Sequence, residues 1–318
     1  MIYLVFIVGL VVIYILVYGR YKKTLISVFF DPVELDSKVQ GELRVVTYNI
    51  AGLPQIISSA RTPRKDSIHC IGKKLNTFDI VNVQEDFNYN SDLFAGNVLP
   101  YRTLHKGKVP LGDGLNTLSS LPIIEYHRIP WQHCSGSDCL TPKGFSYAKI
   151  LLADQVSIDV YNVHANSNDS EKAALARRNN LLQLAQYIHD HSADRPLLVM
   201  GDFNAHYAFK LDNLPIFLKK TNLVDAWVSF CRNNSFPAVN PNFVAQDMLT
   251  LTREEESLDK ILFRNSAEVS FYPTYYQVDK DIFVNAAEEP LSDHLAVIMS
   301  FKWEYKEENH NPSNSSSI

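Results

Sequence analysis

PLLVMGDFN, residues 196–204, combines an apolar run with a cluster of turn-forming residues. The run LLVM has the length and side chains of a buried β-strand, whereas Gly201, Asp202 and Asn204 are residue types that favour tight turns. The segment therefore predicts a buried strand that leads directly into a tight loop. Taken alone, this loop is equally compatible with a plain turn that has no chemical role.

Further segments on both sides have the same strand-like character. They are rich in β-branched residues and comprise LRVVTYN (43–49), DIVNVQE (79–85), SIDVYNVHA (157–165), KILFR (260–264) and HLAVIMSF (294–301). Residues 170–190 predict an amphipathic helix. Asp169-Ser170 offers its N-terminal cap, and its apolar face comprises Ala174, Leu181, Leu182, Ala185 and Ile188. Strands that alternate with helices indicate a layered α/β fold.

Polar residues of catalytic type recur where these strand-like runs end or begin. Some follow an apolar run, namely Asn49, Glu85, His164, Asp202 and Asn204, and others precede one, namely Asp259, Asp293 and His294. Ends of neighbouring strands commonly meet at one edge of a sheet and form a site there. Each residue also has an ordinary structural explanation, such as a turn cap, a solvated pair or a core histidine. The order of the whole set favours the functional interpretation.

This ordered series resembles the endonuclease/exonuclease/phosphatase superfamily, which includes pancreatic-type deoxyribonucleases, abasic-site endonucleases, inositol polyphosphate 5-phosphatases and neutral sphingomyelinases. The resemblance spans residues 43–302. It implies a four-layer α/β sandwich, in which two packed β-sheets are flanked by helices. It also implies hydrolysis of a phosphoric diester with Mg²⁺, or Mn²⁺ in its place, because a hard divalent cation with oxygen ligands offsets the charge of the phosphate.

The resemblance also implies a role for each residue of the series. Glu85 and Asn49 would hold the metal ion, and Asp293 would join a second metal position or orient the substrate. The catalytic group comprises His294 as general base, Asp259 as the carboxylate that fixes its tautomer, Asp202 as the residue that holds the attacking water, Asn204 as a donor to the phosphate, and His164. His164, if charged, would stabilise the phosphate or assist the leaving oxygen.

A second resemblance narrows the substrate. The segment SDCLTPKGF, residues 137–145, places Asp138 five residues before Lys143-Gly144. This spacing is similar to that in neutral sphingomyelinases and inositol-phosphosphingolipid phospholipases, where the pair is thought to switch between states. A surface loop with an incidental ion pair would have the same spacing. Together with the catalytic series, the pair predicts a phospholipase C type hydrolase of a membrane phospholipid or sphingolipid head group.

Three alternatives stay open. A nuclease on the same fold would need a basic groove with stacking aromatics, yet the net charge is −5 and Arg177-Arg178 are expected to face solvent, so no nucleic acid partner is expected. An inositol polyphosphate phosphatase would need a dense basic cluster. The non-enzymatic alternative is a membrane-tethered binding module.

The chain shows no long aromatic-tipped hairpin for bilayer insertion, and Trp131 is expected to be a packing residue. Protein partners are not indicated.

The first residues differ in kind from the rest. The run from Ile2 to Tyr18 has no charged residue and precedes Arg20, Lys22 and Lys23. Seventeen residues of helix reach roughly 25 Å, so residues 1–23 predict a single-pass transmembrane anchor rather than a cleaved signal peptide or a buried helix. The remaining boundaries follow from composition, with a connector at 24–41, a catalytic domain at 42–305 and a disordered tail at 306–318.

The side of the membrane is indicated by opposing signals. Basic residues after the apolar run favour a cytosolic domain. An even number of cysteines, with Cys134 and Cys139 close enough in sequence to pair, favours an oxidising compartment. Sequons at Asn168, Asn233 and Asn314 permit glycosylation. A lumenal or extracellular domain is therefore favoured over a cytosolic one.

Overall fold

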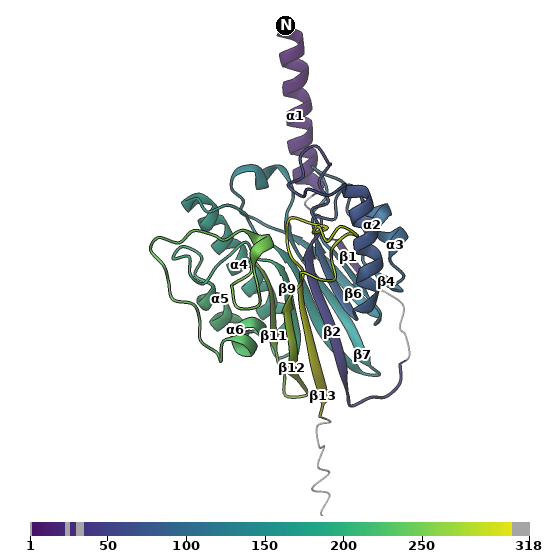
Figure 1. The fold of residues 1–318 in the computed structure, drawn as a ribbon. Coiled ribbons are helices and arrows are strands. Elements are labelled where there is room, and N and C mark those ends of the chain that lie inside the picture. The colour runs from purple at the N-terminus through teal and green to yellow at the C-terminus, as the bar shows by residue number, and fades with distance from the viewer. Residues whose placement is uncertain (1, 23–25, 30–34, 307–318) are drawn as a thin grey trace, which may run out of the picture.

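The computed structural model describes residues 2–22, 26–29 and 35–306 of the chain. Within them two β-sheets pack face to face and helices cover their outer faces (Figure 1). The first sheet has seven strands in the order β1 (Ile26–Phe29), β6 (Ile123–Pro130), β7 (Gly144–Ala153), β8 (Val156–His164), β9 (Leu197–Asp202), β11 (Asp259–Arg264) and β10 (Val224–Asp225). The second has six, in the order β12 (Val269–Val278), β13 (Val297–Tyr305), β2 (Gln40–Asn49), β3 (Ile80–Gln84), β5 (Asn116–Ser119) and β4 (Tyr101–Arg102). The predicted α/β sandwich is confirmed.

Two apolar clusters separate the layers. The larger contains the inner faces of both sheets together with residues of α4 (Glu171–Ser192), α5 (Leu214–Thr221) and α6 (Ala226–Cys231). The smaller lies between the second sheet and the pair α2 (Arg64–Lys74) and α3 (Asn90–Gly96). Short 3₁₀ turns complete the described elements at Leu75–Thr77, Gly136–Leu140 and Met248–Thr250. Burial of alternating strand residues on both faces is what holds the four layers together.

The predicted helix is α4, and Ser170 caps it by accepting a hydrogen bond from the backbone N–H of Ala173. Two predictions about its faces are wrong. Leu182 is half exposed, because Leu181 and Leu184 fill the buried stripe. Arg177 is fully buried rather than solvated, since its Nε donates to Asp212 at 2.7 Å and its Nη1 donates to two backbone carbonyls. The second paired basic residue, Arg178, donates to the carbonyl of Leu211.

Buried amides join the two sheets, and we call Asn82, Gln84 and Asn162 the polar seam. Asn82 of β3 donates to the carbonyls of Tyr161 and Met200 in the opposite sheet, at 3.0 and 3.3 Å. Gln84 donates to the side-chain oxygen of Asn162 at 2.7 Å, and Asn162 donates to the carbonyl of Val83 at 3.0 Å. All three side chains are fully buried. Gln84 is therefore not part of a solvated pair, and the seam fixes how β3 lies across β8 and β9.

Gly201 allows β8 and β9 to approach each other at the point where both strands reach the site. A Cβ atom at this position would lie 2.1 Å from the carbonyl oxygen of Val163. Real Cβ atoms do not come so close to backbone, so the glycine of GDFN is required by packing rather than by turn geometry. The predicted strand followed by a loop is confirmed here as β9 and the residues after it.

The N-terminal predictions have mixed outcomes. The apolar run forms α1 (Ile2–Lys22), which rises above the body of the protein in Figure 1. Among the described residues, no helix combines the length and the apolar character needed to cross a membrane, so the predicted transmembrane anchor is not confirmed. The predicted connector is not wholly irregular, because Ile26–Phe29 pairs with β6 as an edge strand. The tail at residues 307–318 lies outside the described residues.

The polar seam makes a prediction about stability. Asn162→Ala would leave Gln84 and the carbonyls of Val83 and Asn116 without their buried partners. We expect the free energy of unfolding to fall by about 3 kcal/mol, since each unsatisfied buried group costs roughly 1–3 kcal/mol. Urea denaturation followed by circular dichroism measures this change. Asn242→Ala, at an exposed position, is the control, and a loss for Asn162→Ala no larger than that of the control would contradict the role of the seam.

Candidate active site

The residues predicted from the strand ends meet at one edge of the sandwich. In the first sheet, His164 pairs with Asp202 in parallel register, and Asp202 pairs with Asp259 in antiparallel register. In the second sheet, Asn49 pairs with Gln84, so that Glu85 follows directly. The two sheets are joined here because Asn49 donates a hydrogen bond to Asp202 at 3.1 Å. The predicted convergence of strand ends is therefore present.

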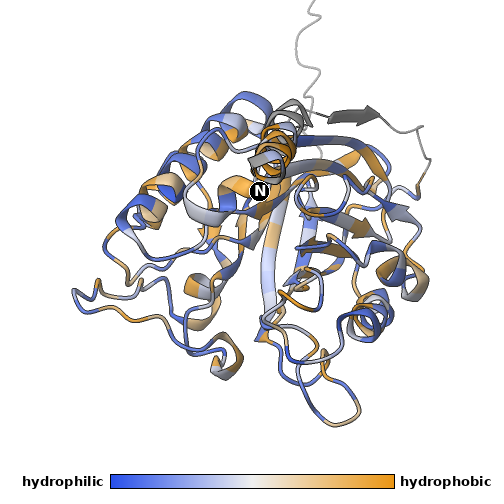
Figure 2. Cartoon of the chain, turned by 90° about the horizontal axis from the view of Figure 1, so that it is seen from above, coloured by the Kyte–Doolittle hydropathy of each residue, from blue (hydrophilic) through white to orange (hydrophobic). Residues whose placement is uncertain are grey.

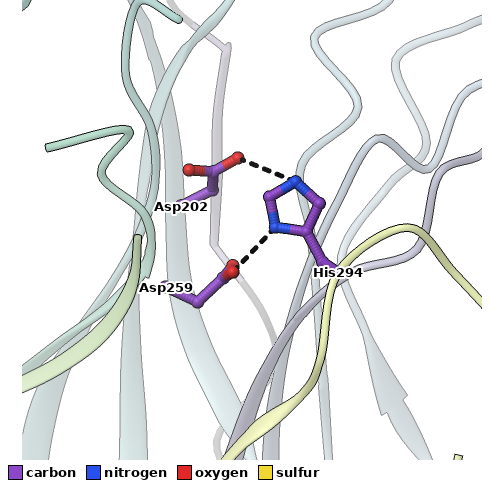
Figure 3. Close-up of side chains that lie close together, drawn as sticks. All are labelled: Asp202, Asp259 and His294. Carbon is purple, nitrogen blue, oxygen red and sulfur yellow. Dashed lines mark hydrogen bonds and ion pairs between the residues drawn. The ribbon is translucent and has the colours of Figure 1, made fainter. Parts of the chain in front are cut away.

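His294 stands between two carboxylates (Figure 3). Its Nδ1 donates to Oδ2 of Asp259 at 2.8 Å, and its Nε2 lies 4.0 Å from Oδ2 of Asp202. Burial alone would lower the pKa of His294, but the adjacent carboxylates, Asp259 above all, raise it to about 10. The metal-free protein therefore holds an imidazolium at neutral pH. Since Asp259 occupies Nδ1, the nitrogen that faces Asp202 is the one available for proton transfer.

Asp202 is the most densely contacted carboxylate of the site. Its Oδ1 accepts from the backbone N–H of Asn204 at 2.9 Å, and its Oδ2 accepts from Asn49. Its burial would raise its pKa, but the positive charges of His294 and of the Lys143 ammonium hold that pKa below its ordinary value. Asp202 is thus a stable anion that can orient a water molecule toward His294.

Asn204 adopts a left-handed backbone conformation with φ of +50°. Asparagine tolerates this conformation better than most residues, because its short amide can bond locally. Its side-chain N–H₂ group donates to the carbonyl of Ala165 at 3.2 Å and lies beside Asp202 through the backbone turn. The second proton of this amide is the one suited to a phosphate oxygen.

Glu85 and Asn49 provide the oxygen-rich position predicted for the metal. The Asn49 amide lies between two carboxylates and donates to Glu85 at 3.3 Å and to Asp202 at 3.1 Å. Burial raises the pKa of Glu85, and repulsion from Asp293 adds to this effect, whereas Lys143 opposes it. A partly buried carboxylate near a second carboxylate, with the amide oxygen of Asn49 beside it, is a donor set that suits Mg²⁺. These residues therefore fit the expected ion.

The backbone at Glu85 is held in an unusual conformation. Its φ is +58°, which is uncommon for a residue with a side chain. Gly114 packs so closely against it that a Cβ there would lie 3.0 Å from the Cα of Glu85. Such conformations are concentrated at functional sites, where the surrounding structure maintains them.

Asp202, Asp259 and His294 also lie close enough together to hold a cation, with ligand atoms within 4.8 Å of one another. The 2.8 Å hydrogen bond between Asp259 and His294 is the geometry of a base and the carboxylate that orients it. This geometry suits proton transfer at His294, whereas Glu85 and Asn49 offer oxygen atoms that could bind a cation.

His164 is buried and uncharged. Burial first, and then the nearby Lys143 ammonium, lower its pKa to about 3. The charged form of His164, on which that predicted role depends, is therefore disfavoured in this state of the protein. Its Nε2 lies 3.6 Å from Asp202, and its Nδ1 has no hydrogen-bond partner among the described residues. A neutral imidazole with a free nitrogen can still donate one hydrogen bond to a substrate oxygen.

Asp138 and Lys143 form an ion pair at 3.0 Å beside this group. Only about a tenth of either side chain is exposed, so the pair is not an incidental surface contact. Burial would raise the pKa of Asp138, but Lys143 and the backbone N–H of Ser167 lower it. The disulfide between Cys134 and Cys139 closes the loop that carries Asp138, as the sequence spacing suggested. Cys70 and Cys231 are free thiols.

Sequence reasoning missed three polar residues that hold the site in place. Ser167 donates to Asp138 through both its backbone N–H and its hydroxyl, at 2.6 and 3.0 Å. Ser292 donates to the carbonyl of Asn49 at 2.7 Å and so ties the loop of His294 to β2. Asn166 accepts from the backbone N–H of Ser135 at 2.7 Å. Trp131 is a packing residue, as predicted, with its indole N–H donating to the carbonyl of His164.

Comparison with known proteins agrees with this geometry. The chain belongs to the endonuclease/exonuclease/phosphatase family, whose model matches residues 46–294. A curated relative is the sphingomyelinase of Mycobacterium tuberculosis, which is 35% identical over 293 residues. The match covers 90% of this chain and 58% of the relative, so this chain spans little more than half of that protein's length.

Solved structures share the fold at lower sequence identity. Sphingomyelinase C from Streptomyces griseocarneus superposes with a TM-score of 0.55 at 19% identity, over 82% of this chain and 99% of that one. A beta toxin mutant from Staphylococcus aureus, with bound magnesium ions, gives 0.56 at 18% identity, over 84% and 100%. These values establish a common sandwich and leave the chemistry to be argued from the site.

The His294–Asp259 ion pair predicts how the stability of the metal-free protein depends on pH. Folding raises the pKa of His294 from 6.5 to about 10. Its contribution to stability is therefore lost as the pH rises from about 6.5 toward about 10. Burial raises the pKa of Asp259 to about 6, so the pair also loses its anion below that pH. The difference in free energy of unfolding between wild type and His294→Gln, measured in urea with EDTA, should be largest near about pH 6.5 and should fall as the pH rises from there. A difference that grows between about pH 6.5 and about pH 10 would contradict the assignment.

Proposed function

We propose that this protein is a Mg²⁺-dependent phosphodiesterase that cleaves the head group of sphingomyelin or a closely related membrane phospholipid. The observation that carries the proposal is the His294–Asp259–Asp202 arrangement beside Glu85 and Asn49. It combines an oriented base, a water-holding carboxylate and a site for a hard cation. The family and the 35% identity to a sphingomyelinase support the same reaction.

The residues of this chain would act in a defined order. Asp202 orients a water molecule, and Nε2 of His294 accepts its proton as the water oxygen attacks phosphorus. The bond between phosphorus and the oxygen of the lipid then breaks, and this oxygen takes up a proton from solvent water while His294 returns its own proton to the solvent. The phosphorylated head group leaves the membrane and the lipid alcohol stays. When bound at Glu85 and Asn49, Mg²⁺ would offset the charge of the phosphate and lower the proton affinity of His294 through charge repulsion.

Lys143 supplies the argument for the lipid substrate. Its ammonium influences the pKa values of Glu85, His164 and Asp202 at once, so it lies near all three residues of the site. In the present state it is held by Asp138 at 3.0 Å. We infer that this pair exchanges partners when a phosphate arrives, with Lys143 turning to the phosphate oxygens. The spacing of the pair is the feature that resembles sphingolipid phospholipases.

The alternative substrates are less well supported. A nuclease would need a basic groove, but Arg177, one of the few paired basic residues, is committed to Asp212 inside the protein. A binding module without activity has no need for a base whose tautomer is fixed by a buried carboxylate.

We also propose a lumenal or extracellular location, because the disulfide at Cys134–Cys139 persists only in an oxidising compartment.

The substrate class is tested with the full chain and Mg²⁺ on five substrates in parallel. These are sphingomyelin, inositol-phosphosphingolipid, a phosphoinositide, plasmid DNA and bis-p-nitrophenyl phosphate. We expect sphingomyelin to be hydrolysed fastest and EDTA to abolish turnover. Preferential cleavage of DNA or of the phosphoinositide would contradict the proposed substrate, and no cleavage of any of them would favour the binding module.

The base is tested by His294→Ala. We expect kcat to fall by about a thousandfold, within the range that loss of a general base produces, while circular dichroism shows a folded protein. His189→Ala removes an exposed histidine of α4 and is the matched control. A His294→Ala protein with at least a tenth of normal turnover would overturn the role of His294.

The ion pair is tested by Asp138→Asn, which removes the charge but little volume. We expect turnover of sphingomyelin to fall by about tenfold or more, because Lys143 and Ser167 lose the anion that positions them. Asp169→Asn changes an exposed aspartate two residues before the start of α4 and should leave turnover unaltered. Unchanged turnover in Asp138→Asn would remove the switch and leave the assignment of His294 intact.

A further inference from the structure

Two adjacent isoleucines are presented to solvent by the loop that follows β2. Ile56 is 93% exposed and Ile57 is 60% exposed. Single exposed apolar residues are ordinary on protein surfaces, but two in succession at a loop tip are not explained by the fold. This loop begins directly after Asn49, so its tip lies on the edge of the sandwich that carries the site.

Hydrogen bonds hold the tip in its exposed shape. The backbone N–H groups of Ile57 and Ser58 both donate to the carbonyl of Pro54, at 2.9 and 3.1 Å. Gln55 is fixed on both sides, since its N–H donates to the hydroxyl of Tyr89 at 3.0 Å and its side-chain oxygen accepts from the N–H of Arg64 at 2.6 Å. A turn restrained in this way cannot fold its isoleucines back onto the core, so their exposure is a built feature.

Three further loops present apolar side chains at the same edge. Leu140 is 63% exposed, just before β7 begins beside the end of β8. Val244 is 82% exposed, on the segment that leads to Asp259. The ring of its neighbour Phe243 packs at a tilt against His206, with ring centroids 4.8 Å apart. Leu104 is 59% exposed, on the loop that returns to β5 next to the end of β3. We call Ile56, Ile57, Leu104, Leu140 and Val244 the apolar rim.

The N-terminal helix adds apolar surface at this end of the molecule. In Figure 1, α1 rises from the end at which β2 and β9 reach the site, opposite the end at which β13 finishes. Figure 2 looks down on this end and shows α1 end-on, coloured mainly as hydrophobic. Its described side chains include Tyr3 and Phe6, which are 83% and 66% exposed.

We propose that the apolar rim is a docking surface for a lipid bilayer, with Ile56 and Ile57 as its main insertion point. This inference rests on the proposed function, because a site that acts on lipid head groups must meet them at the membrane surface. The rim residues stand on separate loops around the site rather than in one contiguous patch. A protein partner covering them would block access to the site, whereas a bilayer delivers the substrate between them.

The test compares the full chain with the double variant Ile56→Asp, Ile57→Asp. Vesicles of phosphatidylcholine and sphingomyelin supply the interfacial substrate, and bis-p-nitrophenyl phosphate supplies the soluble one. We expect turnover on vesicles to fall by about tenfold or more, since each aspartate removes a buried apolar side chain from the interface. Turnover of the soluble diester should stay within about twofold.

Val98→Asp is the matched control. Val98 is 76% exposed but lies just before β4, whose start pairs with the end of β5 and so lies at the edge away from the site. We expect it to affect neither substrate. A double variant with normal turnover on vesicles, or one that loses both substrates equally, would overturn the proposal, as would an equal vesicle defect in Val98→Asp.

Hydrogen–deuterium exchange separates this proposal from the proposed function. With vesicles, the wild-type amides of residues 55–58 should gain protection from exchange, whereas those around Val98 should not. Protection without hydrolysis of any diester would support docking and reject the proposed activity. Hydrolysis of the diesters without protection of these amides would support the proposed activity and reject docking through the apolar rim. The protein could instead form a dimer in the absence of vesicles. If Ile56→Asp dissociated that dimer, the loop tip would be a contact between two copies of the chain, and the proposal would be overturned.

Discussion

The buried hydrogen bonds of the polar seam are the constraint on which the site depends. Two sheets that met only through apolar side chains could shift relative to each other at little cost, because hydrophobic contact is not directional. Asn82, Gln84 and Asn162 have partners in one arrangement only, and each would be left unsatisfied by a shift. The seam therefore fixes β3 against β8 and β9, and Asn49 comes within 3.1 Å of Asp202 as a consequence.

Charge balance governs what this edge can bind. Glu85, Asp202, Asp259 and Asp293 bring four carboxylates to one place, and the nearest cations are His294 and Lys143. An anionic phosphate would be repelled by such a group unless a further cation joined it. The raised pKa of His294 has the same cause, since the excess of negative charge around the imidazole stabilises its protonated form. A hard divalent ion would reduce the repulsion between the carboxylates and the phosphate, and it would also lower the pKa of His294 so that it can act as a base. The proposed Mg²⁺-dependent chemistry follows from this requirement.

The pattern of strand-like runs predicted a layered α/β fold with polar residues at the strand ends, and the resemblance to the superfamily implied the sandwich and a role for each of those residues. The GDFN loop and the Ser292-Asp293-His294 segment adjoin apolar runs that could only be buried strands. Side chains whose partners lie far away in sequence were not predictable. Arg177 was expected to face solvent, because the sequence does not show that Asp212 packs beside it. A solvated Gln84-Glu85 pair was an open alternative, because the sequence does not show that Gln84 bonds to Asn162. The charge of His164 also required the structure, since burial and Lys143 together determine it.

The central claim is that water attacks phosphorus and that the bond to the lipid oxygen breaks. Hydrolysis of sphingomyelin in ¹⁸O-labelled water, followed by mass spectrometry of both products, tests it most directly. The account predicts phosphocholine with one ¹⁸O atom on its phosphate and ceramide with none, only when Mg²⁺ is present. Free choline as the product, or label in the alcohol, would contradict it.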